Sequence, residues 1–132
     1  YGLPTDRSGR HAAMYKPFHL IGMELGISVL SAALRHEPTG QSREFRGDAV
    51  AVAKRDLAPG DMLDGEGGWT VWGKCMPARR SVAAGALPIG LAHGLRVTRP
   101  VARDTVVTRA DVEALPDSEA MRMRAEAEAM AG

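Results

Sequence analysis

The chain has 132 residues, of which 45% are hydrophobic and 25% are charged, a balance typical of a globular protein in water. The formal net charge is +1 and only 5% of the residues are aromatic, so we expect no nucleic-acid partner held by a basic surface or by base stacking. The single cysteine, Cys75, excludes an internal disulfide and a zinc site built from cysteines, and it is typical of a reducing, cytoplasmic compartment.

An apolar helix is predicted over residues 17–36, after an irregular polar segment at 1–16. Pro17 suits the first turn of a helix, because its missing N–H would have no partner there. Apolar residues then dominate until Pro38, which ends the helix together with Gly40. We expect this helix to be buried on most sides, either against the rest of the chain or against a second copy in a homo-oligomer.

The same helix is not expected to cross a membrane. It is short for a span, and it carries His19 and Glu24, whose side chains are costly in a bilayer. No basic amino-terminal region is followed by an apolar stretch and a cleavage site. Because the chain begins at Tyr1, we expect it to be a piece of a longer protein.

A module of short strands and many turns is predicted over residues 48–115. "AVAVAKR", "WTVWG" and "LRVTR" have the pattern of strands, and the stretches between them contain Pro and Gly. Near its end, Thr108 is a candidate N-cap of a short helix, with Asp111 at the third helical position as in a capping box. The tail at 116–132 consists of strong helix formers and is expected to be an exposed terminal helix.

The predicted module contains an internal repeat with an offset of about 44 residues. Each copy has a strand, a two-residue turn and a second strand, with Pro59-Gly60 in the first turn and Arg103-Asp104 in the second. Two such units are expected to pair their apolar faces across a pseudo-twofold axis. The matched pairs are Arg55 and Arg99, Leu57 and Val101, Ala58 and Ala102, Met62 and Val106, and Leu63 and Val107.

This repeat, with "LPIGLAHGLRVTRPVARDTVVTRADV" as its second half, resembles the SAF domain over residues 48–115. SAF domains have the β-clip fold, resemble type III antifreeze proteins and the C-terminal part of sialic acid synthases, and occur in flagellar P-ring assembly chaperones and sugar-acid dehydratases. The resemblance implies a mainly β fold, here preceded by one apolar helix and followed by a short terminal helix.

A longer resemblance covers about residues 12–115. "MYKPFHLIGMELGISVLSAAL", "AVAKRDLAPGDMLDGEGGWTVWGKCMPA" and "ALPIGLAHG" are similar to the C-terminal part of bacterial NAD(P)-dependent oxidoreductases described as homoserine-dehydrogenase-like proteins with a SAF domain. Some members are similar to a reductoisomerase acting on 1-deoxy-D-xylulose 5-phosphate. The resemblance implies that residues 1–47 end an upstream catalytic domain, and that NAD(P) binds an upstream nucleotide-binding domain rather than these residues.

Two functions follow from the resemblances. In the first, the SAF module shapes the substrate cleft or a subunit interface of a cytoplasmic NAD(P)-dependent oxidoreductase and is not catalytic alone. In the second, the chain is a free-standing SAF-type module that binds a sugar acid or acts as a chaperone. The apolar helix at 17–36 favours the first function, because a free module has no need of it.

Four residues are candidates for contact with a substrate. Lys16 and His19 lie at the start of the predicted helix, where an ammonium and an imidazole would contact an anionic or hydroxylated substrate or relay a proton. The alternative, which we favour from the sequence, is that His19 only caps the helix or packs against it. Glu24 is the third, but five residues turn a helix by about 500°, so we expect it to pair with Arg35 or another arginine rather than with His19. Lys74 is the fourth, with solvated surface charge as the alternative interpretation, and Cys75 beside it is expected to be at least half-buried.

The Gly-rich stretch "AKRDLAPGDMLDGEGG" at 53–68 is predicted to be a structural turn rather than a ligand loop. Gly65, Gly67 and Gly68 lack the G-x-G-x-x-G spacing of a dinucleotide site, and the sequence after them is strand-like rather than helical. Asp61 and Asp64 do not match a calcium loop, and the histidines are scattered, so no metal site is expected.

Overall fold

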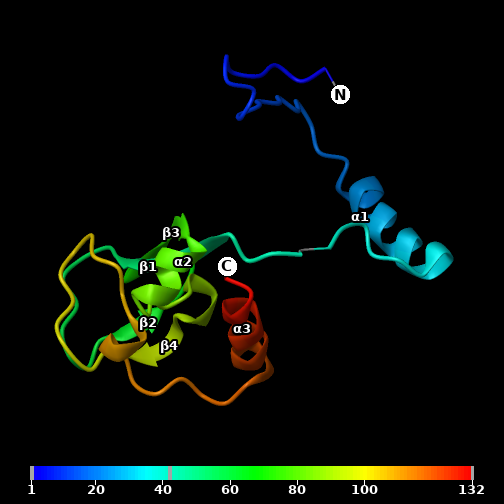
Figure 1. Ribbon diagram of the computed structural model, residues 1–132. Helices are drawn as coiled ribbons and strands as arrows, with labels where there is room; N and C mark the ends of the chain where they lie inside the picture. The colour runs from blue at the N-terminus through cyan, green and yellow to red at the C-terminus, as the bar shows by residue number, and fades with distance from the viewer. Residues whose placement is uncertain (1, 42, 132) are drawn as a thin grey trace. The chain divides into compact units, whose positions relative to one another are not determined.

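The computed structural model describes residues 2–41 and 43–131. The chain divides into two compact units, Tyr1–Gln41 and Ser42–Gly132, which we name unit 1 and unit 2. The described residues contain three α-helices and two antiparallel strand pairs (Figure 1). The strand pairs agree with the predicted short strands, while the chain as a whole carries helix as well as strand. No helix among the described residues has the length and apolar character needed to cross a membrane.

In unit 1, helix α1 spans Ile21–Leu30 and continues as a π-helical turn over Ser31–Arg35. The predicted start at Pro17 was wrong by four residues, because Leu20 is the N-cap residue. Leu20 makes no capping hydrogen bond with its side chain, so no capping residue in the sequence marks the start of the helix at Ile21.

Helix α1 is apolar and exposed. Ile21, Met23 and Ile27 are 73%, 69% and 63% exposed, and none of the ten residues of the helix is buried. Among the described residues of unit 1 nothing covers this helix, and its expected cover by the rest of the chain or by a second copy stays a prediction. Apolar side chains at this exposure are typical of a surface that another protein surface covers.

Unit 2 holds all four strands (Figure 1). Strands β1 and β3 are antiparallel, with Gly47 opposite Pro77 and Ala53 opposite Val71, and β2 pairs with β4. The other elements are helices α2 and α3 and two single 3-10 turns. The bounds are β1 Gly47–Ala53, β2 Met62–Asp64, β3 Val71–Pro77, α2 Ala78–Ala83, the 3-10 turn Ile89–Leu91, β4 His93–Arg96, the 3-10 turn Arg109–Asp111, and α3 Glu119–Ala129.

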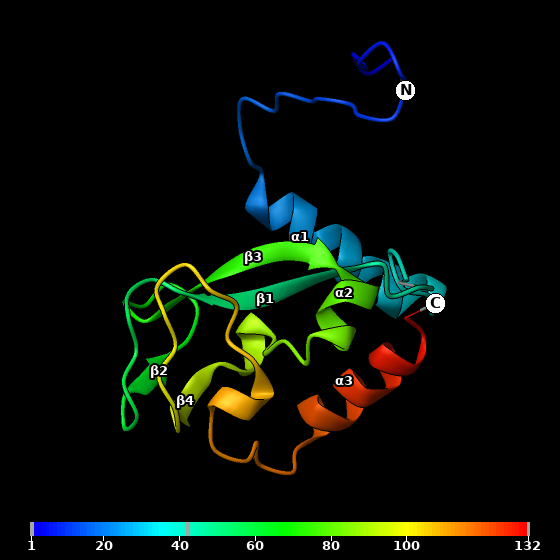
Figure 2. The same cartoon turned by 60° about the vertical axis from the view of Figure 1, so that its left-hand side comes forward.

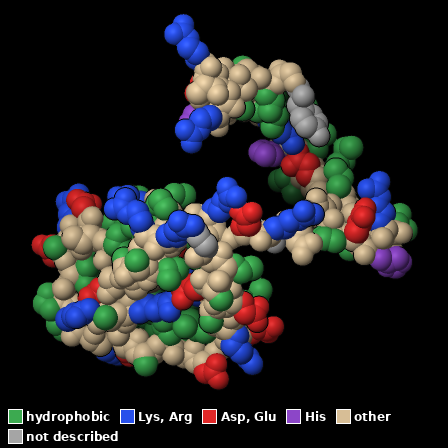
Figure 3. Space-filling view, in the orientation of Figure 1, with side chains coloured by type: hydrophobic (Ala, Val, Ile, Leu, Met, Phe, Trp, Pro, Cys, Tyr) green, Lys and Arg blue, Asp and Glu red, His purple; other side chains and the backbone are tan. Residues whose placement is uncertain are grey.

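One hydrophobic core fills unit 2. It is built from β1, from the strands of the repeat and from the segment before β4, and its largest fully buried side chains include Leu63, Leu87, Val97 and Val107. Outside the core, Lys and Arg side chains are interspersed with Asp and Glu on the face shown in Figure 3, in agreement with the net charge near zero. The buried apolar side chains hold the two halves of the repeat together, and the surface carries charges of both signs.

The backbone hydrogen bonds of unit 2 follow the repeat in the sequence. Leu57 and Val101, which the alignment equates, exchange both of their backbone hydrogen bonds, with N–O distances of 2.8 and 3.0 Å. The bond from the N–H of Ala53 to the carbonyl of Thr105, at 3.0 Å, has its counterpart in the bond from Val97 to Asp61, at 2.8 Å. A twofold axis between Leu57 and Val101 relates the two bonds.

The same twofold axis relates the two turns of the repeat. The N–H of Gly60 donates to the carbonyl of Val97, and the N–H of Asp104 donates to the carbonyl of Ala53, both at 2.8 Å. Gly60 and Asp104 both have left-handed backbone conformations, with φ of 97° and 63°. The aligned turn residues therefore occupy equivalent places in the structure.

The Gly-rich loop marks where the two halves differ. Lys54 donates its N–H to the carbonyl of Thr70, and in the second half Thr98 donates to Asp111, at 2.9 and 2.8 Å. Leu63 precedes Thr70 by seven positions, whereas its counterpart Val107 precedes Asp111 by four. The glycines thus lie in a loop that is longer in the first half than in the second.

Candidate functional site

Three of the predicted site residues meet at the start of α1. The carboxylate of Glu24 binds the ammonium of Lys16 through Oε1, and its Oε2 lies 3.3 Å from Nδ1 of His19. The prediction that His19 and Glu24 do not pair was wrong. His19 precedes the first residue of the helix, so the angle between helical positions does not apply to it. Nor does Glu24 pair with Arg35, whose guanidinium lies 3.6 Å from Glu37.

This cluster has the parts of a proton-transfer site but lies open to water. The side chains of Lys16 and Glu24 are 42% and 38% exposed, and that of His19 is 72% exposed. A carboxylate that holds one ring nitrogen of an imidazole orients the other nitrogen toward a ligand or solvent. Ion pairs at this exposure contribute little to stability, so the arrangement can change when a partner covers it.

Lys74 lies in unit 2, on strand β3 opposite Val50. Its neighbour two residues earlier on the same face of the strand is Trp72, which is 39% exposed. Cys75 is exposed, contrary to the expectation of a half-buried thiol. Lys74 belongs to unit 2 and the other three candidates to unit 1, so neither unit by itself contains all four.

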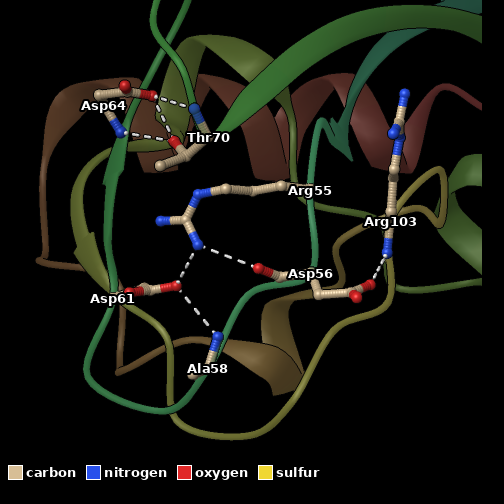
Figure 4. A network of polar contacts seen from close by, with 7 residues as sticks. All are labelled: Arg55, Asp56, Ala58, Asp61, Asp64, Thr70 and Arg103. Atoms are coloured by element: carbon tan, nitrogen blue, oxygen red, sulfur yellow. Dashed lines mark hydrogen bonds and ion pairs between the residues drawn. The ribbon is translucent and has the colours of Figure 1, made fainter.

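Asp64 organises the Gly-rich loop (Figure 4). Its carboxylate accepts hydrogen bonds from the N–H of Trp69 at 2.5 Å, from the N–H of Thr70 at 3.0 Å and from the hydroxyl of Thr70. Burial alone would raise the pKa of Asp64, but the hydrogen bonds from Thr70 and Trp69 outweigh it and lower the pKa to about 2. A Cβ at Gly68 would overlap this carboxylate.

These contacts test whether the loop fits the phosphates of NAD(P). A pyrophosphate site needs free N–H groups at the start of a helix. Here an anionic carboxylate already occupies the N–H groups of Trp69 and Thr70, and strand β3 follows at Val71. The loop therefore does not fit the cofactor, and its geometry supports the interpretation of a structural turn.

A second polar network holds the two turns of the repeat together (Figure 4). Arg55 donates to the carboxylate of Asp61 at 2.9 Å, and the same carboxylate accepts from the N–H of Ala58 at 3.0 Å. The carboxylate of Asp56 accepts from the N–H of Arg103 at 2.8 Å. These charged groups bind one another and the backbone of the turns within the fold.

Sequence reasoning missed a buried ionic network between β1 and α3. The carboxylate of Asp48 is bound by both terminal nitrogens of Arg124, at 2.7 Å each, and by the hydroxyl of Ser81. Nε of Arg124 donates to Glu128 at 2.6 Å, and Arg109 binds the same carboxylate of Glu128. The four-residue spacing of Arg124 and Glu128 is visible in the sequence, but nothing local to either residue indicates Asp48.

The network also sets the charges of its members. Burial alone would raise the pKa of Asp48, but the hydrogen bonds from Arg124 and Ser81 hold it below its ordinary value. The guanidinium of Arg124 also lies 4.8 Å from the centre of the Phe45 ring, within the range of a cation–π contact. Asp48 therefore stays ionised in the fold, as the partner of a single arginine.

An open pocket with a volume of about 540 Å³ adjoins this network through Phe45, which contacts Arg124. Phe45 and Met130 give it apolar walls, and Arg46 and Arg79 line it with positive charge. Arg46 is paired with Glu44, which also lines the pocket. In the described part of the chain, no group of three or more His, Cys, Asp or Glu side chains is placed to hold a metal ion.

Comparison with known proteins adds no relative. No protein-family model and no curated sequence matches the chain.

Proposed function

We propose that unit 2 is a SAF-type module with the β-clip fold, and that it belongs to an NAD(P)-dependent oxidoreductase of the homoserine-dehydrogenase-like family. The single observation that carries the proposal is the twofold pattern of hydrogen bonds around Leu57 and Val101. It supports a duplicated β-clip, because equivalent residues of two copies pair with each other only at a twofold axis. The stretch "MYKPFHLIGMELG" supports the oxidoreductase family.

In this proposal the chain shapes the enzyme rather than performing the redox step. The carboxylates of Asp56, Asp61 and Asp64 are used within the turns of unit 2, which supports a scaffold role. NAD(P) binds an upstream nucleotide-binding domain of the cytoplasmic parent enzyme. The exposed apolar face of α1 is covered by the upstream catalytic domain or by a second copy of the chain.

The cluster of Lys16, His19 and Glu24 contacts the substrate in this proposal. Its ammonium and its imidazole, oriented by Glu24, suit an anionic or hydroxylated substrate beside the hydride-transfer site. Lys74 is the candidate contact from unit 2. The resemblance supports the first three residues, because it places their segment at the end of the catalytic domain.

The reading frame upstream of Tyr1 and a binding experiment test the proposal. We expect that frame to encode a strand followed by G-x-G-x-x-G, and the 132-residue chain to bind no NADPH at micromolar concentration in calorimetry. An upstream frame without a dinucleotide site, or micromolar binding of NADPH by the chain alone, would contradict the proposal.

A second candidate function is binding of a sugar acid by a free-standing module. The observation in its favour is the pocket beside Phe45, which Arg46 and Arg79 line with positive charge. Calorimetry with a panel of sugar mono- and dicarboxylates separates the candidates. Binding that is lost in Arg46→Ala and retained in Arg96→Ala would favour this function over the oxidoreductase. The chaperone role of some SAF proteins would instead appear as binding of a protein partner.

A further inference from the structure

The pocket beside Phe45 is formed within unit 2 alone. Its lining comes from the segment before β1, from the junction of β3 with α2, and from Met130 after the end of α3. Figure 2 shows the end of α3 beside α2. The volume of about 540 Å³ lies in the range of pockets that bind small molecules.

The walls of this pocket are held by contacts inside the fold. The ring of Phe45 is half-buried, and the guanidinium of Arg124 lies 4.8 Å from its centre. Arg124 is itself fixed by its two hydrogen bonds to Asp48. The N–H of Ala78 donates to the carbonyl of Arg46 at 2.9 Å, which ties the segment before β1 to α2. A pocket whose walls are fixed before binding loses less entropy when a ligand enters it.

Arg46 gives the pocket hydrogen-bond donors for an anion. Its Nε binds the carboxylate of Glu44, and its two terminal nitrogens donate to no group of the described residues. A guanidinium carries five N–H groups in a planar fork, so Arg46 can pair with a second carboxylate through these nitrogens. Arg79 adds another positive charge, and the two arginines outweigh the single glutamate of the lining.

The remaining lining is apolar and selects the body of the ligand. Among the described residues that line the pocket, only Glu44, Arg46 and Arg79 have polar side chains. The second candidate function places a sugar acid here. Hydroxyls of a sugar acid that face Phe45 and Met130 would lose hydrogen bonds to water without gaining partners, which costs free energy. An apolar body gains free energy when the same surfaces take it out of water.

We propose that this pocket binds a monocarboxylate with an apolar body. The carboxylate pairs with the terminal nitrogens of Arg46, and the body lies against Phe45 and Met130. Glu44 weakens the binding, because its charge repels the incoming carboxylate and its own carboxylate already occupies Nε of Arg46. The proposal does not depend on the oxidoreductase function.

Three ligands with the same number of carbons test the class of ligand. Hexanoate has a carboxylate and an apolar chain, hexan-1-ol has the chain without the charge, and gluconate has the carboxylate on a chain of hydroxyls. Each is added to the 15N-labelled 132-residue chain, and the amide chemical shifts are followed by NMR. We expect hexanoate to shift the amides of residues 45–47 and 78–80, and the other two ligands to bind at least about fivefold more weakly.

Two outcomes of this titration would overturn the proposal. One is that gluconate or hexan-1-ol binds as tightly as hexanoate, because the site would then not require both the charge and the apolar body. The other is that hexanoate at about 20 mM leaves these amides unshifted, since a ligand of this size in a fixed pocket is expected to bind with a Kd of about 1 mM.

An exchange at Arg46 tests the contact with the carboxylate. Arg46→Met keeps an apolar stem and removes the donors, so we expect the Kd for hexanoate to rise about tenfold. Arg122→Met is the control, because Arg122 is an exposed arginine that does not line the pocket. Circular dichroism checks that both variants are folded. If Arg46→Met binds hexanoate as tightly as Arg122→Met, the proposal is wrong.

An exchange at Glu44 tests the competing charge. Glu44→Gln should lower the Kd for hexanoate about threefold, because the repulsion is gone and Nε of Arg46 becomes available. Glu37→Gln is the matched control: Glu37 is also exposed and also pairs with an arginine two residues away, Arg35, but it does not line this pocket. Equal affinities of the two variants for hexanoate would contradict the role assigned to Glu44.

Discussion

Arg124 donates one hydrogen bond to each carboxylate oxygen of Asp48, both at 2.7 Å, and so joins α3 to β1 across 76 positions of the chain. The two side chains are only 10% and 5% exposed. Moving two charged groups out of water costs free energy, and the bidentate hydrogen bonds between them offset this cost. If one partner is removed, the other remains as an unpaired buried charge. The terminal helix is therefore fixed to unit 2, and not the exposed tail that its composition predicts.

Removal of the guanidinium of Arg124 is expected to leave the buried charge of Asp48 without a partner. Arg124→Met should lower the free energy of unfolding by about 3 kcal/mol, because the carboxylate stays buried without its partner. Asp48→Asn/Arg124→Met should be more stable than Arg124→Met, since no unpaired charge remains. Urea unfolding followed by circular dichroism measures both.

The control for this pair is Arg122→Met on the same helix. Arg122 is exposed, so its loss should change the free energy of unfolding by less than about 0.5 kcal/mol. Equal effects of Arg122→Met and Arg124→Met would show that the ion pair does not hold the helix.

A chain that ends at Leu115 tests whether the module needs its terminal helix. This truncation removes Arg124, the partner of Asp48, and Met121, which lines an apolar pocket together with Leu95. We expect the truncated chain to unfold at a lower temperature than Arg124→Met, because it loses apolar cover as well as the ion pair. Equal melting temperatures of the full and truncated chains would place the boundary of the module at 115.

Gly68 is expected to tolerate no side chain. An added Cβ would overlap the carboxylate of Asp64, whose three hydrogen bonds hold the loop. Gly68→Ala should therefore lower the free energy of unfolding by about 2 kcal/mol. Gly90→Ala is the matched control, because a Cβ at Gly90 meets nothing within 4 Å. Similar urea midpoints for the two variants would mean that the loop rearranges at no cost.

The repeat could be predicted from the sequence because its two copies match residue by residue at a constant offset. Leu57 and Val101, which the alignment matches, exchange two backbone hydrogen bonds at a twofold axis. The capping box was also predicted, since Asp111 is only three residues from Thr108, and its carboxylate accepts from the N–H and the hydroxyl of Thr108 at 2.7 and 2.6 Å.

The features that could not be predicted depend on where an element begins or on residues distant in sequence. His19 and Glu24 meet because α1 begins at Ile21, and helical geometry applied from Pro17 separates them. The composition of the tail predicts an exposed helix, on which Arg124 would be in contact with water. Its partner Asp48 lies in strand β1, which only the tertiary fold brings near. Local patterns carry no information on either contact.

The equivalence of Gly60 and Asp104 gives a test of the repeat by substitution. Both residues have left-handed φ, of 97° and 63°, which costs a residue with a Cβ about 1 kcal/mol or more. Gly60→Ala should therefore destabilise the fold by about 1 kcal/mol, and Gly60→Asn by less, since Asn tolerates this conformation. Asp104→Gly should be neutral or stabilising. A destabilising Asp104→Gly in urea unfolding would show that Asp104 is held by its side chain instead.

The lowered pKa of Asp64 predicts how the stability of the fold depends on pH. Its pKa falls from 3.8 to about 2 on folding: burial alone would raise it, but the hydrogen bonds from Thr70 and Trp69 outweigh burial. The unfolded chain therefore binds a proton at Asp64 more readily than the folded chain. The carboxylate stabilises the fold above about pH 4, and this contribution is lost as the pH falls toward 2.

Asp64→Asn removes this titration. We expect the variant to be less stable than the unmodified chain at pH 7, and its free energy of unfolding to fall less steeply between about pH 4 and pH 2. Asp117→Asn is the control, because it removes the same charge from an exposed position. Urea unfolding at several pH values across this range measures the slopes. If Asp64→Asn and Asp117→Asn give the same slope, the acid sensitivity of the fold does not come from the Gly-rich loop.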